Sequence, residues 1–227
     1  MKELEGRVAL VTGAARNIGR ATALELAAAG ASVAVNARTS SNAIESVAAE
    51  IGGLGILADV TDEKAVQAMV SQIVARYGRL DILVNNAAVR AGSWEEVTRA
   101  ILDGAWHCAQ ACMPHLGAQG AIVNIGGLSA HTGAAGRPHV VAAKLGLVGL
   151  TRALAHDLAP KAVTVNCVVP GLIDTERISP SAHGGRVGPI GRCGTPQDVA
   201  AAVRFLAGPG ARYITGQALH VSGGAFT

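Results

Sequence analysis

The chain has 227 residues, of which 50% are apolar, 15% charged and 3% aromatic. This length suits one domain, with a core large enough to fold without disulfides or a metal. A net charge of +3, scattered along the chain, excludes the strongly basic surface that nucleic-acid binding requires. The chain contains two tyrosines, a number that restricts the chemistry open to it.

Short apolar runs alternate with helical stretches along the chain. Strands are expected at 8–11, 32–36, 54–58, 80–84, 121–125, 162–169 and 217–221. Helices are expected at 18–29, 42–51, 62–77, 94–112, 138–158 and 197–207. Strands separated by helices predict parallel crossovers, and continuously apolar strands predict a sheet covered on both faces. The predicted fold class is therefore α/β, a doubly wound parallel sheet of about seven strands within one domain, 1–227.

The clearest helix is the one predicted over 62–77. Its apolar residues recur at the spacing of one helical face. Thr61 is the predicted N-cap, and Gly78 follows the predicted end.

Cysteine usage and the start of the chain favour a cytoplasmic location. The four cysteines form no CxxC motif, which is typical of a reduced protein. We expect no signal peptide, because the start lacks the apolar stretch and cleavage site. Residues 104–136 carry no charge, but Pro114 and several glycines interrupt them, so no membrane span is expected.

One group of potential metal ligands occurs in the helix predicted over 94–112 and just beyond it. Cys108, Cys112 and His115 share a helical face, with His107 nearby. All four belong to one segment, and the sequence offers no second cluster to complete a metal site. Small cysteines also suit helix packing, so we expect packing here and no metal.

A glycine turn follows the first predicted strand. It reads TGAARNIG, residues 12–19, and a helix is predicted directly after it. Strand, tight turn and helix N-terminus together form a binding place for a nucleotide phosphate, because the first amides of the helix face the anion. Asn17 takes the place of the middle glycine, and asparagine tolerates left-handed backbone angles.

The end of the second predicted strand indicates which dinucleotide is bound. It reads Asn36-Ala37-Arg38, without the acidic residue that would bind the ribose diol of NAD. Arg16 and Arg38 are available instead for a 2′-phosphate, which a guanidinium binds well. The sequence therefore favours NADP(H) over NAD(H). The alternative is that Arg38 is an ordinary solvated arginine.

Together with later motifs, these features resemble the short-chain dehydrogenase/reductase family, nearest its 3-oxoacyl-acyl-carrier-protein reductase branch. The resemblance extends over nearly the whole chain. Its motifs are TGAARNIG, Asp59-Val60, Asn85-Asn86-Ala87-Ala88, VNIGG at 123–127, Lys144, Pro170-Gly171-Leu172-Ile173-Asp174-Thr175, and YITGQALHVSGG at 213–224. It implies a Rossmann-type fold and an NAD(P)-dependent oxidoreductase. It also implies a homodimer or homotetramer that associates through helix 138–158 and the C-terminal VSGGAFT.

The resemblance also implies which residues contact the cofactor. The pyrophosphate and adenosine side is assigned to Gly13, Arg16, Asn17, Ile18 and Gly19, and the adenine to Asp59 and Val60. The ribose is assigned to Asn86, Ala87 and Ala88, and the nicotinamide ribose hydroxyls to Lys144. The carboxamide is assigned to Ile173 and Thr175, and Pro170 and Gly171 are also assigned to the cofactor. The family has a glycine where Ala88 stands, so this alanine adds a methyl group near the cofactor.

The family's catalytic tyrosine, serine and asparagine have no counterpart in this sequence. Val140 stands four residues before Lys144 at the tyrosine position, Gly127 at the serine position and Ile101 at the asparagine position. Lys144 alone of the catalytic set remains. Tyr77 and Tyr213 lie far along the chain, and both are interpreted as structural. Carbonyl reduction by the family's usual route is therefore not expected, whereas cofactor binding is.

Three residues are candidates for the missing proton donor. His131 lies in the loop before the long helix, and His139 lies beside Val140; a histidine titrates near neutrality. The alternative is that both are surface or loop histidines. Lys144 itself could exchange protons, because an apolar neighbour such as Val140 would lower its pKa.

Two segments are shorter than in the family: 88–94, and the substrate lid near 176–191. A short lid implies a small substrate, an open site, or no substrate. Two functions stay open: an oxidoreductase with an altered proton path acting on a small carbonyl, alcohol or imine, and a catalytically inactive NADP(H)-binding subunit. A non-redox enzyme on the same scaffold is the weakest reading.

Overall fold

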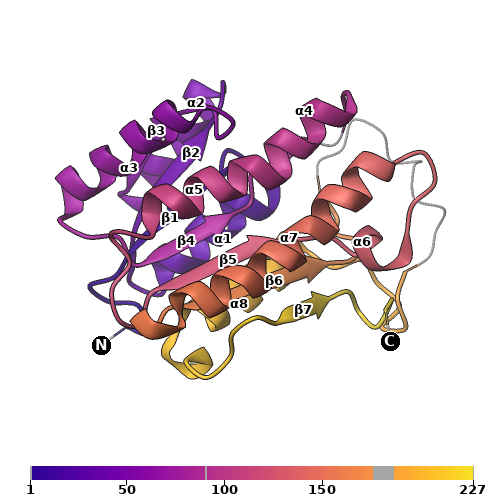
Figure 1. Cartoon of the computed structure of the whole chain (residues 1–227). Helices are drawn as coiled ribbons and strands as arrows, with labels where there is room; N and C mark the ends of the chain where they lie inside the picture. The colour runs from indigo at the N-terminus through magenta and orange to yellow at the C-terminus, as the bar shows by residue number, and fades with distance from the viewer. Residues whose placement is uncertain (1, 90, 176–186, 227) are drawn as a thin grey trace.

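The computed structural model describes residues 2–89, 91–175 and 187–226 (Figure 1). Its sheet has seven parallel strands in the order β3-β2-β1-β4-β5-β6-β7. The strands are β1 (Val8–Val11), β2 (Ser32–Ala37), β3 (Leu54–Leu57), β4 (Ile82–Asn85), β5 (Ala121–Ile125), β6 (Thr164–Pro170) and β7 (Ala218–Val221). The strand order reverses between β1 and β4, as in Rossmann-type sheets, which confirms the predicted fold class.

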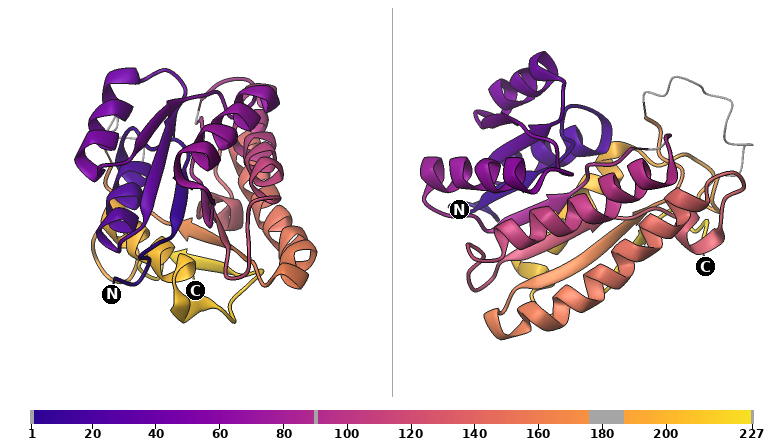
Figure 2. Two further views of the ribbon diagram at one scale, coloured as in Figure 1. Left: turned by 90° about the vertical axis from the view of Figure 1, so that its left-hand side faces the viewer. Right: turned by 45° about the horizontal axis from the view of Figure 1, so that its top comes forward.

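Helices cover both faces of the sheet (Figure 2). They are α1 (Asn17–Ala28), α2 (Ser41–Ile51), α3 (Glu63–Tyr77), α4 (Trp94–Thr98), α5 (Gly104–Cys112), α6 (Ser129–Thr132), α7 (Pro138–Leu158) and α8 (Pro196–Ala207). Alternate strand residues face opposite sides: Val11 packs in the cluster with α1 and α8, whereas Leu10 packs in the cluster with α3, α5 and α7. Both faces are thus buried, which explains the continuously apolar strands.

The helix predicted over 62–77 begins one residue later, at Glu63. Its N-cap is Asp62, whose carboxylate accepts hydrogen bonds from two amides of the first turn. The prediction of Thr61 as the cap was wrong. Thr61 instead donates its amide and hydroxyl to the carboxylate of Asp59, both at 2.9 Å. Thr61 and Asp62 are both residue types that cap helices. Because the hydroxyl of Thr61 is bonded to Asp59, Asp62 is the residue that caps this helix.

The helix predicted over 94–112 is interrupted between α4 and α5. Residues Arg99–Asp103 form a π-helical turn. Such turns occur frequently at functional sites. The wider turn carries Ile101, whose side chain is buried against α7.

Other boundaries also differ from the sequence prediction. The sixth strand runs over Thr164–Pro170 rather than 162–169, because Ala162 adopts a left-handed conformation (φ 54°) that ends the preceding turn. The short helix α6 was not predicted. The predicted lid near 176–191 falls mainly on 176–186, outside the described residues. In the part of the chain that the structure describes, no helix has both the length and the apolar character needed to cross a membrane.

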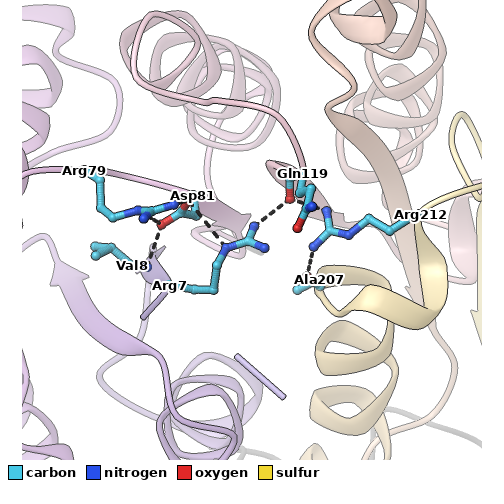
Figure 3. Close-up of polar contacts among 7 residues, drawn as sticks. All are labelled: Arg7, Val8, Arg79, Asp81, Gln119, Ala207 and Arg212. Atoms are coloured by element: carbon cyan, nitrogen blue, oxygen red, sulfur yellow. Dashed lines mark hydrogen bonds and ion pairs between the residues drawn. The ribbon is translucent and has the colours of Figure 1, made fainter. Parts of the chain in front are cut away.

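A buried carboxylate joins the amino ends of the central strands (Figure 3). Asp81 accepts a hydrogen bond from the amide of Val8 at 2.9 Å and two from Arg79 at 2.8 and 2.6 Å. Arg7 approaches the same carboxylate at 3.4 Å and donates to the carbonyl of Gln119 at 2.6 Å. Asp81 thus connects the starts of β1 and β4, and Arg7 extends this connection to the segment that precedes β5.

We expect Asp81→Asn to lower the free energy of unfolding by on the order of 3 kcal/mol, because Arg7, with 13% of its side chain exposed, loses its charged partner. Arg79→Gln is the matched control. That side chain is 56% exposed, so its loss should cost under about 1 kcal/mol. Urea unfolding with an unchanged m-value measures both. Equal losses in the two variants would contradict the assignment.

Candidate active site

The glycine turn between β1 and α1 has the backbone shape that phosphate binding requires. Gly13 and Asn17 both have positive φ, 62° and 51°, which confirms that the asparagine adopts the left-handed conformation. A Cβ at Gly19 would lie 2.4 Å from the carbonyl oxygen of Gly13. The turn therefore packs directly against the first turn of α1, and the N-terminus of this helix is positioned for an anion.

Two side chains attach this turn to the end of β4. The amide of Asn86 donates to the carbonyls of Thr12 and Gly13, both at 2.9 Å. The hydroxyl of Thr12 also accepts from the backbone amides of Asn86 and Ala87, at 3.0 and 3.1 Å. The turn is thereby fixed at the point where the strand order reverses, the usual place for a dinucleotide.

The residues assigned to the 2′-phosphate lie at the ends of β1 and β2. Asn36 turns into the sheet, where its amide donates to the carbonyl of Ala58 at 2.9 Å. Arg38 is therefore the first long side chain after β2 that faces solvent, 60% exposed and 3.9 Å from Asp59. Arg16 is also exposed, directly before α1. These guanidinium groups suit the binding of a phosphate.

A cavity of about 930 Å³ opens at the carboxyl ends of the central strands. The predicted cofactor residues that line it are Ile18, Asn86, Ala88, Lys144, Pro170, Gly171 and Ile173. Those outside its described lining are Gly13, Arg16, Asn17, Gly19, Arg38, Asp59, Val60, Ala87 and Thr175. The first set comes from four separate parts of the chain, which the fold brings to one place.

The four residues that the sequence analysis assigned to the family's catalytic positions all line this cavity. The ammonium of Lys144 donates to the carbonyl of Ile125 at 2.5 Å. Val140 and Ile101 pack in one apolar cluster, 8% and 2% exposed. A Cβ at Gly127 would meet only Cγ of Lys144, at 3.9 Å. The cavity wall is thus apolar at two of these positions and open at the third.

The two candidate histidines lie elsewhere in the described structure. Neither belongs to the described lining of the cavity. The ring of His131 contacts His220 and Phe226, with centroids 4.7 and 5.3 Å apart. His139 is the second residue of α7 and is half-buried.

Sequence reasoning missed three polar residues of the cavity. Ser129 and Thr132 belong to α6, and Arg137 directly precedes α7; all three line the cavity. The only signal available in the sequence was the position of their loop, directly before the long helix that carries Lys144. Which of its side chains face inward depends on α6, a helix too short to show a periodic pattern.

No cysteine or tyrosine belongs to the described lining of the cavity. Cys108 and Cys112 are buried in the core, and burial raises the pKa of Cys108 to about 12. Within the described residues, no three histidine, cysteine or acidic side chains gather as a metal ion would need. Tyr77 packs against the core and Tyr213 is fully exposed, and neither belongs to the described lining of the cavity.

Comparison with known proteins gives the family. A family profile described as "Enoyl-(Acyl carrier protein) reductase" matches residues 13–226. The 3-oxoacyl-[acyl-carrier-protein] reductase FabG of Salmonella typhimurium is 37% identical over 240 residues, 98% of each chain. FabG of Staphylococcus aureus is 39% identical over 239 residues, 96% of this chain and 97% of the relative.

Solved structures agree. A short chain dehydrogenase from Burkholderia cenocepacia in complex with NADP has a TM-score of 0.93 at 36% identity, covering 98% of this chain and 99% of that chain. A blue fluorescent protein from a metagenomic library, in complex with NADPH, has a TM-score of 0.92 at 34% identity and full coverage of both chains. The fold and the sequence matches define an oxidoreductase scaffold. The chain belongs to the short-chain dehydrogenase/reductase family.

The rings of His131, His220 and Phe226 pack together, and this cluster makes the stability of the fold depend on pH. Burial lowers the pKa of His220 below its ordinary value of 6.5, and the nearby His131 lowers it further. The folded state therefore favours the neutral ring of His220. The contribution of this ring to the free energy of unfolding is fully present above pH 6.5 and is lost as the pH drops below it. We expect a lower melting temperature at pH 5.5 than at pH 7.5, with a smaller difference in His220→Phe. His156→Gln, at an exposed histidine on α7, should keep the full difference. An unchanged pH dependence in His220→Phe would refute this origin.

Proposed function

We propose that the chain is an NADP(H)-dependent oxidoreductase with a non-standard proton path, acting on a small carbonyl, alcohol or imine. The observation that carries this proposal is the shared cavity of Lys144 with Ile101, Gly127 and Val140. The last three carry no side-chain proton donor at the positions where the resemblance implies the family's asparagine, serine and tyrosine. When bound, NADP(H) supplies or accepts the hydride.

The cofactor proposal rests on the shape of the binding region. The glycine turn would hold the pyrophosphate at the N-terminus of α1, and Arg16 and Arg38 would bind the 2′-phosphate. Lys144 would bind the nicotinamide ribose from the floor of the cavity. The NADP and NADPH complexes of similar structures support this assignment.

Among the three proton-donor candidates, the geometry favours Lys144. It lines the cavity, whereas neither His131 nor His139 is part of the described lining. Its ammonium donates to the carbonyl of Ile125 at 2.5 Å, and an ammonium carries three donor protons in all. An imine suits such a site, because a protonated imine already carries its proton and needs less help from an acid.

The second candidate function is a catalytically inactive NADP(H)-binding subunit. The packing of Val140 against Ile101 favours it, because this contact places apolar groups where a proton relay would lie. In both readings we expect a cytoplasmic homodimer or homotetramer. The four cysteines, all free, fit a reducing compartment.

The cofactor preference is tested with Arg38→Asp. Loss of the guanidinium and gain of a carboxylate should weaken NADPH binding about tenfold to a hundredfold, since charge-assisted hydrogen bonds are lost. NADH binding should hold or improve, because a carboxylate can accept from the ribose diol. Titration of cofactor fluorescence measures both, with Arg99→Asp as an exposed control. Unchanged NADPH affinity would show that Arg38 is a solvated arginine.

The proton path is tested by rebuilding the site. Wild-type protein is assayed for NADPH oxidation with small carbonyls and imines, beside Val140→Tyr combined with Gly127→Ser. The pair should raise carbonyl reduction by about 10²–10⁴, the usual contribution of a general acid. Val140→Phe with Gly127→Ser supplies the ring without its hydroxyl. Ile101→Asn is added last, because that position is buried among apolar groups.

The wild type decides between the two functions. Turnover of an imine or a small carbonyl that Lys144→Met abolishes, with NADPH still bound, supports the altered proton path. Tight NADPH binding without any turnover favours the inactive subunit.

A further inference from the structure

The charged side chains in the described lining of the cavity are all positive. Its described lining includes two cationic side chains, Lys144 and Arg137, and no carboxylate. Lys144 is assigned to the cofactor, whereas nothing in the proposed function uses Arg137. A second cation, in a wall whose described residues include no acidic group, favours a ligand that brings its own negative charge.

The backbone of Arg137 is fixed while its side chain is available. Its amide donates to the carbonyl of Ala134 at 3.3 Å, and its carbonyl accepts from the amide of Val141 at 3.0 Å, at the start of α7. Within the described residues, the guanidinium forms no hydrogen bond or ion pair. The arginine is therefore anchored at the helix start, with all five of its donors open to a ligand.

Val140 and Lys144 lie four residues apart on one face of α7, and Arg137 is the N-cap residue directly before the helix. All three line the cavity. At a rise of about 1.5 Å per residue, Val140 lies about 6 Å along the helix axis from Lys144, towards the end at which Arg137 stands. A reacting carbon at the level of Val140 thus lies between the cofactor lysine and the helix end that carries the arginine.

We propose that Arg137 binds the carboxylate of a short oxo acid or imino acid, the substrate class of this site. This inference rests on the proposed function. An acid group close to the reacting carbon would face the helix end that carries Arg137, because this arginine and Val140 line the same cavity. Ser129 offers a hydroxyl in the same wall, and Ile101 and Val140 cover the short apolar body.

The reaction balances with the cofactor of the proposed function. The carbonyl carbon of the oxo acid accepts a hydride from NADPH, and its oxygen accepts a proton, to give a hydroxy acid and NADP⁺. With an imino acid the carbon of the C=N bond accepts the hydride. The product is then an amino acid, and the proton on nitrogen comes with the substrate. The carboxylate takes no part in the bond changes and serves to orient the substrate.

The test uses binding, so that it does not depend on turnover. Oxamate carries a carboxylate beside a non-reducible carbonyl, and oxamide is its neutral counterpart. Both are titrated calorimetrically into the full-length protein, with and without NADPH. We expect oxamate to bind and oxamide to bind at least tenfold more weakly. Arg137→Gln should weaken oxamate about tenfold to a hundredfold and leave NADPH affinity unchanged. Arg137→Lys should restore part of the loss.

The control removes the same charge from the same helix. Arg152→Gln lies on α7 at an exposed position outside the described lining, and it should leave oxamate binding as in the wild type. The proposal is overturned if oxamate does not bind the wild type, if oxamide binds equally well, or if Arg137→Gln changes nothing. A protein that discriminates oxamate from oxamide but does not bind NADPH would refute the proposed function and leave the carboxylate site in place.

Discussion

The pair of hydrogen bonds that Asn86 donates to Thr12 is the contact on which the site depends. It joins the carboxyl ends of β1 and β4, the two strands between which the sheet reverses its order. An open parallel sheet leaves a crevice at such a reversal, and the two side chains fix the glycine turn at its edge. The orientation of α1, and hence the place where an anion can bind, follows from this contact.

The chemistry of the site divides along the same cavity. Toward α1 the backbone is arranged for a dinucleotide, with positive φ at Gly13 and Asn17 and close packing at Gly19. Toward α7 the wall is apolar at Ile101 and Val140, where acid catalysis would need a proton donor. Positioning of a hydride donor can still lower the barrier by several kcal/mol without an acid. Such a site suits substrates that need orientation more than protonation.

The fold and the backbone shape of the glycine turn could be predicted because their signals are local. The glycine turn and the left-handed Asn17 follow from residue types at fixed spacing, and the order of strands and helices follows from alternating apolar runs. The cavity wall could not be predicted in the same way. Whether Arg137 or His131 faces the cavity depends on how a four-residue helix turns the loop, and only the packing of His131 on β7 and the C-terminal residues decides it. The choice between Thr61 and Asp62 as helix cap likewise depended on a neighbouring turn.

The adjacent glycines 126 and 127 differ in how freely they can vary. A Cβ at Gly126 would lie 2.8 Å from the buried sulfur of Cys167, so packing holds this position as glycine. At Gly127 the space is open and its φ is not positive, so a side chain can appear there without displacing the backbone. A serine at position 127 would therefore add a hydroxyl to the cavity wall with little effect on folding. The scaffold and the catalytic identity of this site can change independently.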